Sequence, residues 1–473
     1  MIAGSSSRWA RLSRRKLIRK LWICCLLPLL FGATPPWMPA QSSKAGKGGR
    51  LLGIYVFAGE RLTADSAEKL PSRFMPFVKY CGYNTLEFCD YSFEYPESGR
   101  ANYLESSRIR IADAHREGLK LFIILSTNMS REWAALRGEP SGDALTKIMF
   151  NPVARPDEFK QRIDDVQRSI EKGFSEADGF EVFAGDWGGC MGEGCDYEQY
   201  LSFGRAYAQV LRKLGLHSQL TLNTWAIANW GITFDPGKTT LWDAETHLSQ
   251  KVIDSDISFA DAVTLPGHNL YRGLVRTLYT EANRSVPDWP DPVAIQTIHA
   301  KGKRAYLWPH FIVDDDRSRR MTWRKVHFEV RYLKELAEKS RALGIDGVFV
   351  NAYNPPYQMG NIFAYGQLNR DPAKPARTIL REFAALIAQQ GGVDRLTEVF
   401  SFLENHSWWG SQMPANYRLK PLPCKIGTYE EARASLGEVT PLNQSPAPLL
   451  MPPKDYLAEV ASTLAFMQEQ YGD

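Results

Sequence analysis

The feature that most constrains the fold is an eightfold alternation, from residue 51 onward, of a short β-rich run with a helical segment. Several of the runs are nearly continuous stretches of apolar residues, which is typical of parallel strands buried on both faces. Eight strand–helix repeats predict a closed (β/α)₈ barrel. The predicted strands are Leu52–Phe57, Tyr83–Phe88, Lys120–Leu125, Gly179–Phe183, Gln219–Asn223, Asp261–Leu265, Arg304–Trp308 and Ile345–Asn351.

Amphipathic segments separate these runs, and several end just before a glycine, the residue that most readily adopts the left-handed C-cap. An open, doubly wound sheet would show similar alternation, but it requires phosphate-binding glycines after the first strand. Here that strand is followed by Ala58-Gly59-Glu60, so the fingerprint is missing. The predicted helices are Ala67–Tyr80, Ser107–Glu117, Pro156–Lys172, Tyr197–Leu214, Asp243–Ile253, Pro292–Ala300, Trp323–Leu343 and Pro375–Gln390.

The chain divides into four predicted parts. Residues 1–33 contain a basic region and then the apolar run Leu21–Ala33, which is shorter than the ~20 residues of a spanning helix but typical of a signal peptide. This part is predicted to be a signal peptide or a membrane anchor. Residues 34–50 form a linker, residues 51–392 the barrel, and residues 393–473 a helical C-terminal extension. The expected location is periplasmic or secreted, with an inner-membrane anchor if the first part is retained.

Charge and cysteine content narrow the function further. The chain has 57 basic and 53 acidic residues, and much of the excess lies in the first 20 residues. The sequence contains no basic stripe of the kind that would predict nucleic-acid binding.

An odd number of cysteines follows residue 33, so at least one thiol stays unpaired or pairs between chains. Cys190 and Cys195 are close enough to form a small disulfide loop in an oxidising compartment. Half a zinc site is the competing interpretation, but no second CxxC or nearby histidine completes it.

In a (β/α)₈ barrel the active site lies at the C-terminal ends of the strands. The residues at these predicted ends are rich in carboxylates, amides and indoles, which suits sugar binding and two-carboxylate hydrolysis. Each also has a structural interpretation: Asp186 can cap the following turn, and Glu87 can lie in the barrel interior beside a base. The candidates are Glu87, Asp90, Asp186, Trp187, Trp225, His268, His310, Asp314, Asp315, Asn351 and Tyr353.

Other mechanisms lack their sequence signals. There is no GxSxG nucleophile elbow and no GxxxxGK[ST] phosphate loop. The eight histidines never occur as HxH or HExxH, so no metal site is expected. We also expect no cofactor.

Three segments resemble barrels of known glycoside hydrolases: Asp186–Cys190 followed by Cys195, Asn351–Asn354, and Phe363–Pro372. They are similar to the family 67 α-glucuronidases and to the β-N-acetylhexosaminidase-type families 20 and 84. The resemblance covers roughly residues 51–395. It implies a (β/α)₈ barrel acting on carbohydrate, with Asp186 in the position of the general acid.

The chain departs from those families at this position. The hexosaminidase families carry two adjacent acidic residues where this chain has Asp186-Trp187, and the α-glucuronidases use a glutamate. Two hypotheses follow. In the first, Asp186 is the general acid of a glycoside hydrolase, and Asp314 or Asp315 is the general base or nucleophile. In the second, the barrel is a non-catalytic glycan-binding or envelope protein. The expected partner is a carbohydrate in both cases, and a membrane is contacted only through an uncleaved N-terminal segment.

Overall fold

The computed structural model describes residues 50–56, 73–95, 97–129, 149–185, 188–190, 194–230, 241–267, 290–309, 325–352, 354–407 and 419–472. These residues belong to the compact unit Arg50–Asp473. The predictions for residues 1–49 therefore lie outside the described residues. None of the helices in the described ranges combines the length and hydrophobicity that a membrane-spanning segment requires.

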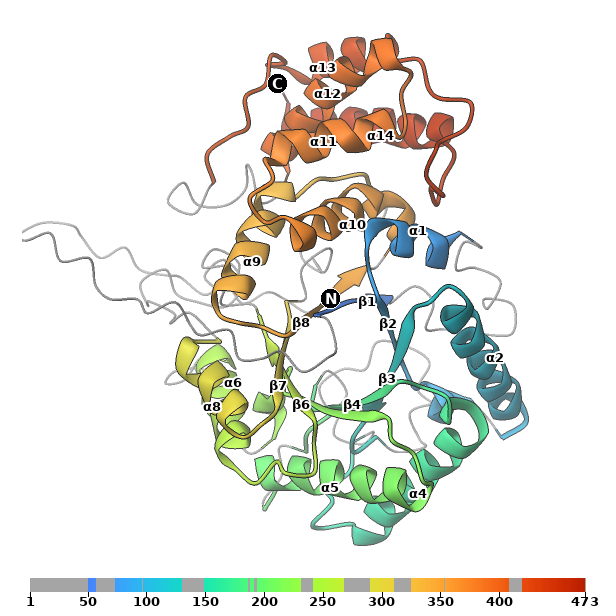
Figure 1. Ribbon diagram of the computed structural model, residues 1–473, viewed down its shortest axis with the longest axis vertical. Coiled ribbons are helices and arrows are strands. Elements are labelled where there is room, and N and C mark those ends of the chain that lie inside the picture. The colour runs from blue at the N-terminus through green and yellow to red at the C-terminus, as the bar shows by residue number, and fades with distance from the viewer. Residues whose placement is uncertain are drawn as a thin grey trace, which may run out of the picture. The chain divides into compact units, whose positions relative to one another are not determined.

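Eight parallel strands close into a barrel in the order β1 to β8, which confirms the predicted fold (Figure 1). Three strands have the predicted bounds, and the others differ from the prediction by one or two residues at one or both ends. The closure joins β8 to β1, where Asn351 lies opposite Tyr55. The strands are β1 (Leu51–Val56), β2 (Thr85–Cys89), β3 (Lys120–Ser126), β4 (Gly179–Phe183), β5 (Gln219–Asn223), β6 (Ala262–Pro266), β7 (Arg304–Trp308) and β8 (Gly347–Ala352).

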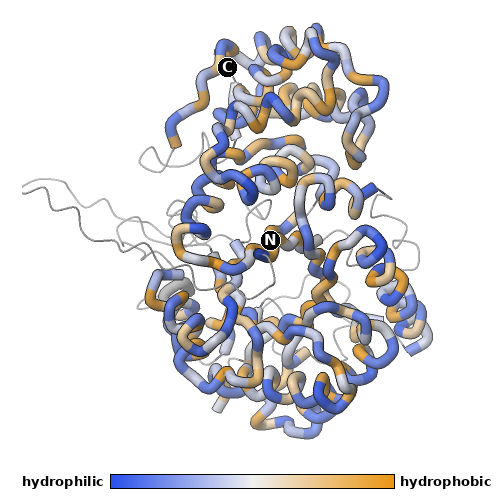
Figure 2. Tube along the Cα trace, in the orientation of Figure 1, coloured by the Kyte–Doolittle hydropathy of each residue, from blue (hydrophilic) through white to orange (hydrophobic). Residues whose placement is uncertain are grey.

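Helices surround the barrel, and hydrophobic and hydrophilic positions are interspersed along them, as expected for helices that bury one face (Figure 2). Predicted and observed bounds differ most at the N-terminal ends. α2 begins ten residues before the predicted Ser107, and α9 begins seven after the predicted Trp323. The helices are α1 (Phe74–Cys81), α2 (Glu97–Arg116), α4 (Pro156–Ser169), α5 (Tyr197–Lys213), α6 (Leu241–Asp254), α8 (Pro292–Ala300), α9 (Val330–Ala342) and α10 (Pro355–Arg370).

The sequence reading missed α10, the helix that directly follows β8. Most of its residues are buried, including polar ones such as Gln358 and Asn361. It contacts α1, α9 and α11, so it has little exposed face and its sequence lacks the amphipathic period that marks a helix. The segment predicted to be the last barrel helix instead contains α11 (Ala376–Ala385), which packs against α12.

The chain ends in a helical extension, as predicted. α12 (Val393–His406), α13 (Tyr429–Gly437) and α14 (Pro453–Tyr471) agree with the predicted segments to within two residues at either end. Together with α11 they form a layer on the side of α10 (Figure 1). The extension and the barrel helices share one large hydrophobic core.

A second core fills the barrel interior. Rings occupy much of it, and Phe122, Tyr306 and Phe349 approach glycines on the neighbouring strands. A Cβ added at Gly53 would lie 2.2 Å from a carbon of the Phe349 ring, so the interior has no room for a side chain there. The barrel interior around Gly53 is therefore packed, as expected for a barrel of this type. A ligand site is expected at the C-terminal ends of the barrel strands.

Candidate functional site

Four aromatic side chains meet at the C-terminal end of the barrel, and we call them the aromatic floor: Tyr55, Phe183, Trp225 and Trp308. Trp308 is the centre of the group. Its ring packs edge to face against Tyr55 at 5.6 Å, Phe183 at 5.2 Å and Trp225 at 5.8 Å between ring centroids. Trp308 is 2% exposed, whereas Trp225 is half-buried. The floor thus has one ring that is accessible enough to meet a ligand.

Strand alternation explains how these rings come together. Successive side chains of a strand point to opposite faces, so Tyr55, Phe183 and Trp308 share the barrel interior with residues two positions before them. The floor also borders polar groups. Asn351, 1% exposed, lies opposite Tyr55, and the Tyr55 hydroxyl donates a hydrogen bond to the Cys89 sulfur at 3.7 Å. The sequence reading chose Trp225 and Asn351 but missed Tyr55 and Phe183.

Two buried glutamates lie deeper in the interior. Glu181 precedes Phe183 by two positions on the same face of β4, and Glu87 lies on β2. The side chains of Glu87, Asn223 and Thr264 interact with the Glu181 carboxyl and lower its pKa, but burial raises the pKa of Glu181 by more. Burial disfavours the charged form of a carboxyl group, so Glu181 retains its proton at a pH where an exposed glutamate has lost it.

Glu87 was predicted to bind substrate, or to pair with a base inside the barrel. The structure places it inside, fully buried, where it interacts with the carboxyl of Glu181. The sequence reading missed Glu181 altogether. In a parallel strand buried on both faces, the run Phe180-Glu181-Val182 does not reveal which positions face the interior.

Asp90 lies just past the end of β2 in a buried polar network. Its carboxylate accepts a hydrogen bond from the Ser92 amide at 2.8 Å. Burial raises the pKa of Asp90, and the nearby Arg162 guanidinium opposes the increase. Arg162 in turn donates to the carbonyl oxygens of Ser126 and Thr127. Asp90 is 1% exposed, so this network fixes the ends of β2 and β3.

The turn after β4 is packed against the neighbouring loops. A Cβ at Gly185 would lie 2.4 Å from the Trp225 carbonyl oxygen, and one at Gly189 would lie 2.2 Å from the Asn229 carbonyl oxygen. Asn128, after β3, pairs with the Gly189 backbone in both directions. It accepts from the Gly189 amide at 3.0 Å and donates to the Gly189 carbonyl at 2.9 Å. Asp186 and Trp187 belong to this turn and lie outside the described residues.

A disulfide joins Cys190 to Cys195 immediately after this turn. The two cysteines are five positions apart in the sequence. The loop that they close precedes α5, whose first turn is capped by Asp196. Both sulfurs are used in the disulfide, which leaves no thiolate there for the alternative zinc site. Within the described ranges, no group of three or more histidine, cysteine, aspartate and glutamate side chains is placed to hold a metal ion.

Several predicted site residues follow strand ends in segments without a described structure. These residues, outside the described ranges, are Asp186, Trp187, His268, His310, Asp314, Asp315 and Tyr353.

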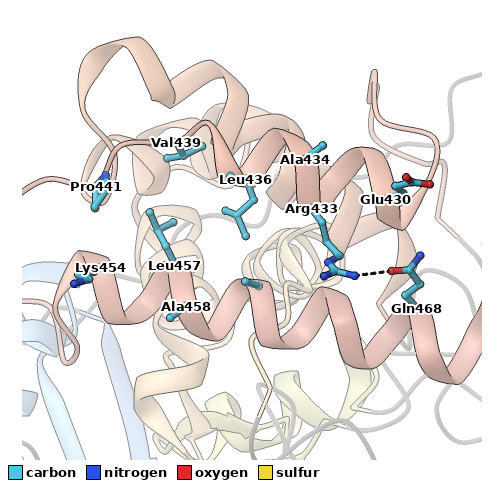
Figure 3. A pocket seen from close by; sticks show the side chains of 12 residues that line it. Glu430, Arg433, Ala434, Leu436, Val439, Pro441, Lys454, Leu457, Ala458 and Gln468 are labelled. Atoms are coloured by element: carbon cyan, nitrogen blue, oxygen red, sulfur yellow. Dashed lines mark hydrogen bonds between the residues drawn. The ribbon is translucent and has the colours of Figure 1, made fainter.

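A groove of about 910 Å³ lies elsewhere, between α13 and α14 of the C-terminal extension (Figure 3). Leu436, Val439 and Leu457 give it an apolar wall. At its rim, the Arg433 guanidinium donates a hydrogen bond to the Gln468 side chain at 3.2 Å. None of the candidate site residues lines this groove.

No protein-family model and no curated protein matches this sequence. Solved structures do match its fold. A GH138 enzyme targeting pectin rhamnogalacturonan II is similar with a TM-score of 0.51 and 11% identity, over 89% of this chain and 57% of that one. A GH115 4-O-methyl-α-glucuronidase with specificity for decorated arabinogalactans is similar with a TM-score of 0.49 and 11% identity. The match covers 89% of this chain and 54% of that one.

An O-GlcNAc hydrolase of Thermobaculum terrenum gives a TM-score of 0.41 and 14% identity, over 75% of this chain and 66% of that one. The chain spans little more than half the length of the GH138 and GH115 enzymes. These structural neighbours are glycoside hydrolases with a TIM barrel. At 11% identity, the likeness to the GH138 enzyme shows a shared fold alone.

Proposed function

We propose that the protein is a glycoside hydrolase that acts on an oligosaccharide or polysaccharide at the C-terminal end of its barrel. The observation that carries this proposal is the aromatic floor, in which a half-buried Trp225 lies beside the buried Trp308 at a centroid distance of 5.8 Å. Flat indole faces suit the apolar faces of sugar rings. The amide of Asn351 next to the floor is a group that binds sugar hydroxyls.

Catalysis would use two carboxylates on opposite sides of the scissile bond. Asp186 is the proposed general acid, which protonates the leaving oxygen. Asp314 or Asp315 is the proposed general base or nucleophile. Gly185 and Gly189 pack closely against the segment that follows β5, and neither glycine position has room for a side chain. This packing supports a fixed backbone before and after Asp186.

The remaining candidates would bind the substrate. Trp187 and Trp225 are proposed to stack on sugar rings, while His268, His310 and Tyr353 are proposed to hold hydroxyl groups. The GH138 enzyme is named as targeting pectin rhamnogalacturonan II, and the GH115 enzyme as specific for decorated arabinogalactans. They supply the first substrates to try.

The proposed location is outside the cytoplasm, in the periplasm or the medium. The disulfide between Cys190 and Cys195 supports it, because disulfides persist in oxidising compartments. The predicted signal peptide or anchor at residues 1–33 supports it independently.

The experiment is a screen of the purified protein against pectic, arabinogalactan and amino-sugar oligosaccharides. Release of reducing sugar and retention on immobilised glycans are measured side by side. Turnover supports the hydrolase. Glycan retention without turnover on any substrate would contradict it and leave a binding barrel.

A further inference from the structure

Ala226 has an unusual backbone conformation. Its φ of 53° and ψ of 26° put it in the left-handed region. No other non-glycine residue in the described ranges has a positive φ. Residues with a Cβ are disfavoured there, and such strain persists only where the surrounding structure imposes it. Ala226 directly follows Trp225 of the aromatic floor, so the strained residue is next to the proposed sugar-binding ring.

The conformation of Ala226 sets the path of the chain around Trp225. Before it, the Trp225 amide donates a hydrogen bond to the Asn223 side-chain oxygen at 2.8 Å. After it, the chain enters the short helix η6 (Ile227–Asn229). A left-handed residue between these two elements turns the backbone sharply. Trp225 is thereby held between a buried asparagine and a helical turn.

The turn after β4 holds this arrangement from the opposite side. A Cβ at Gly185 would lie 2.6 Å from the Ala226 Cβ and 2.7 Å from a ring carbon of Trp225. The Trp230 indole donates a hydrogen bond to the Ala184 carbonyl oxygen at 3.1 Å. The β4 turn therefore packs against both ends of the Trp225–Trp230 segment, and this contact keeps Ala226 in its strained conformation.

We propose that Ala226 is a positioning residue. Its left-handed backbone packs against Gly185 and fixes the Trp225 ring perpendicular to Trp308, as a rigid part of the aromatic floor. The interplanar angle of 89° at 5.8 Å is the arrangement so maintained. A ring fixed before the ligand arrives loses less conformational entropy on binding, so rigidity raises affinity. The expected effect of Ala226 on sugar binding rests on the proposed function. Its expected effect on the position of the Trp225 ring does not.

The test is Ala226→Gly, because glycine adopts the left-handed conformation without a Cβ penalty but also allows many others. The strain is removed, so the Tm of the variant is expected to equal or exceed that of the wild type. The freed backbone no longer fixes Trp225. The coupled circular-dichroism signal of the two close indole rings should fall toward that of Trp225→Phe. For an oligosaccharide turned over in the screen, KM should rise roughly three- to tenfold with kcat nearly unchanged.

Ala154→Gly is the matched control, since Ala154 lies in an exposed turn and does not have a positive φ. It should lower Tm slightly, because glycine gains entropy on unfolding, and leave the circular dichroism and KM unchanged. If no carbohydrate is turned over or bound, the proposed function fails, and the circular-dichroism and Tm measurements alone decide this inference. An unchanged signal in Ala226→Gly, or a loss of Tm as in the control, overturns it.

Discussion

The carboxyl groups of Glu87 and Glu181 interact inside the barrel, on the two strands that flank β3. Both side chains are fully buried. The side chains that interact with Glu181 include the Glu87 carboxyl, the Asn223 amide and the Thr264 hydroxyl, and the phenols of Tyr200 and Tyr306 are also close enough to feel its charge.

This pair makes stability depend on pH. Burial raises the pKa of Glu181 in the folded state, so the folded protein holds this proton more tightly than the unfolded chain. The resulting stabilisation is complete below the unfolded pKa, about 4.3, and is lost as pH rises through the raised folded value. Glu181→Gln removes this titration. As pH rises above about 4, the urea midpoint of the wild type should fall relative to that of Glu181→Gln.

Glu117→Gln, at an exposed position, is the control and should follow the wild type. Parallel pH profiles of the wild type and Glu181→Gln would contradict the raised pKa of Glu181.

A buried ion pair connects the C-terminal extension to the barrel. The Glu404 carboxylate, on α12, accepts hydrogen bonds from the Val330 and Arg331 amides at the start of α9 and from the Arg331 side chain at 3.0 Å. Glu404→Gln leaves the Arg331 charge buried without its counter-charge. We expect a loss of about 3–5 kcal/mol in the free energy of unfolding, measured with urea.

The exposed pair between Arg381 and Asp394 gives the matched comparison. Asp394→Asn should cost at most about 1 kcal/mol. Equal losses in Glu404→Gln and Asp394→Asn would show that the buried pair does not connect the two parts as described.

Much of the fold follows from the sequence because strand period, helix period and Gly caps agree over residues 51–352. What the sequence hides is set by tertiary contacts. α10 is buried on nearly all sides and shows no amphipathic face. Glu181 lies in a strand buried on both faces, so its inward direction depends on the barrel register. The strain at Ala226 depends on the contact with Gly185, and no local signal marks an alanine for it.

Asn128 should stabilise the turn after β4. Its buried amide makes two hydrogen bonds with Gly189 and one with the Phe150 carbonyl, at 2.8–3.0 Å. Asn128→Ala leaves these backbone groups without their partner, which should cost about 1–3 kcal/mol by urea unfolding. Asn151→Ala, which removes a side-chain acceptor from an exposed turn, should cost less. The opposite order of the two losses would contradict this role of Asn128.

The disulfide should stabilise the same region. Replacing both Cys190 and Cys195 by serine is expected to cost about 2 kcal/mol, the chain-entropy value for so short a loop. A reductant should lower the Tm of the wild type and leave that of the double variant unchanged. A wild type whose Tm is insensitive to the reductant, with both thiols shown to be free after treatment, would contradict the expectation.

The central claim is that Asp186 protonates the leaving group of a glycoside, and leaving-group dependence tests it most directly. For a natural oligosaccharide identified in the screen, Asp186→Asn should lose about 10²–10⁴ in kcat, the range for general acid catalysis. An aryl glycoside with an acidic phenol needs little protonation, so the loss there should be much smaller. Asp157→Asn, at an exposed position on α4, should match the wild type on both substrates. Equal kcat in the wild type and Asp186→Asn on the natural substrate would contradict the account.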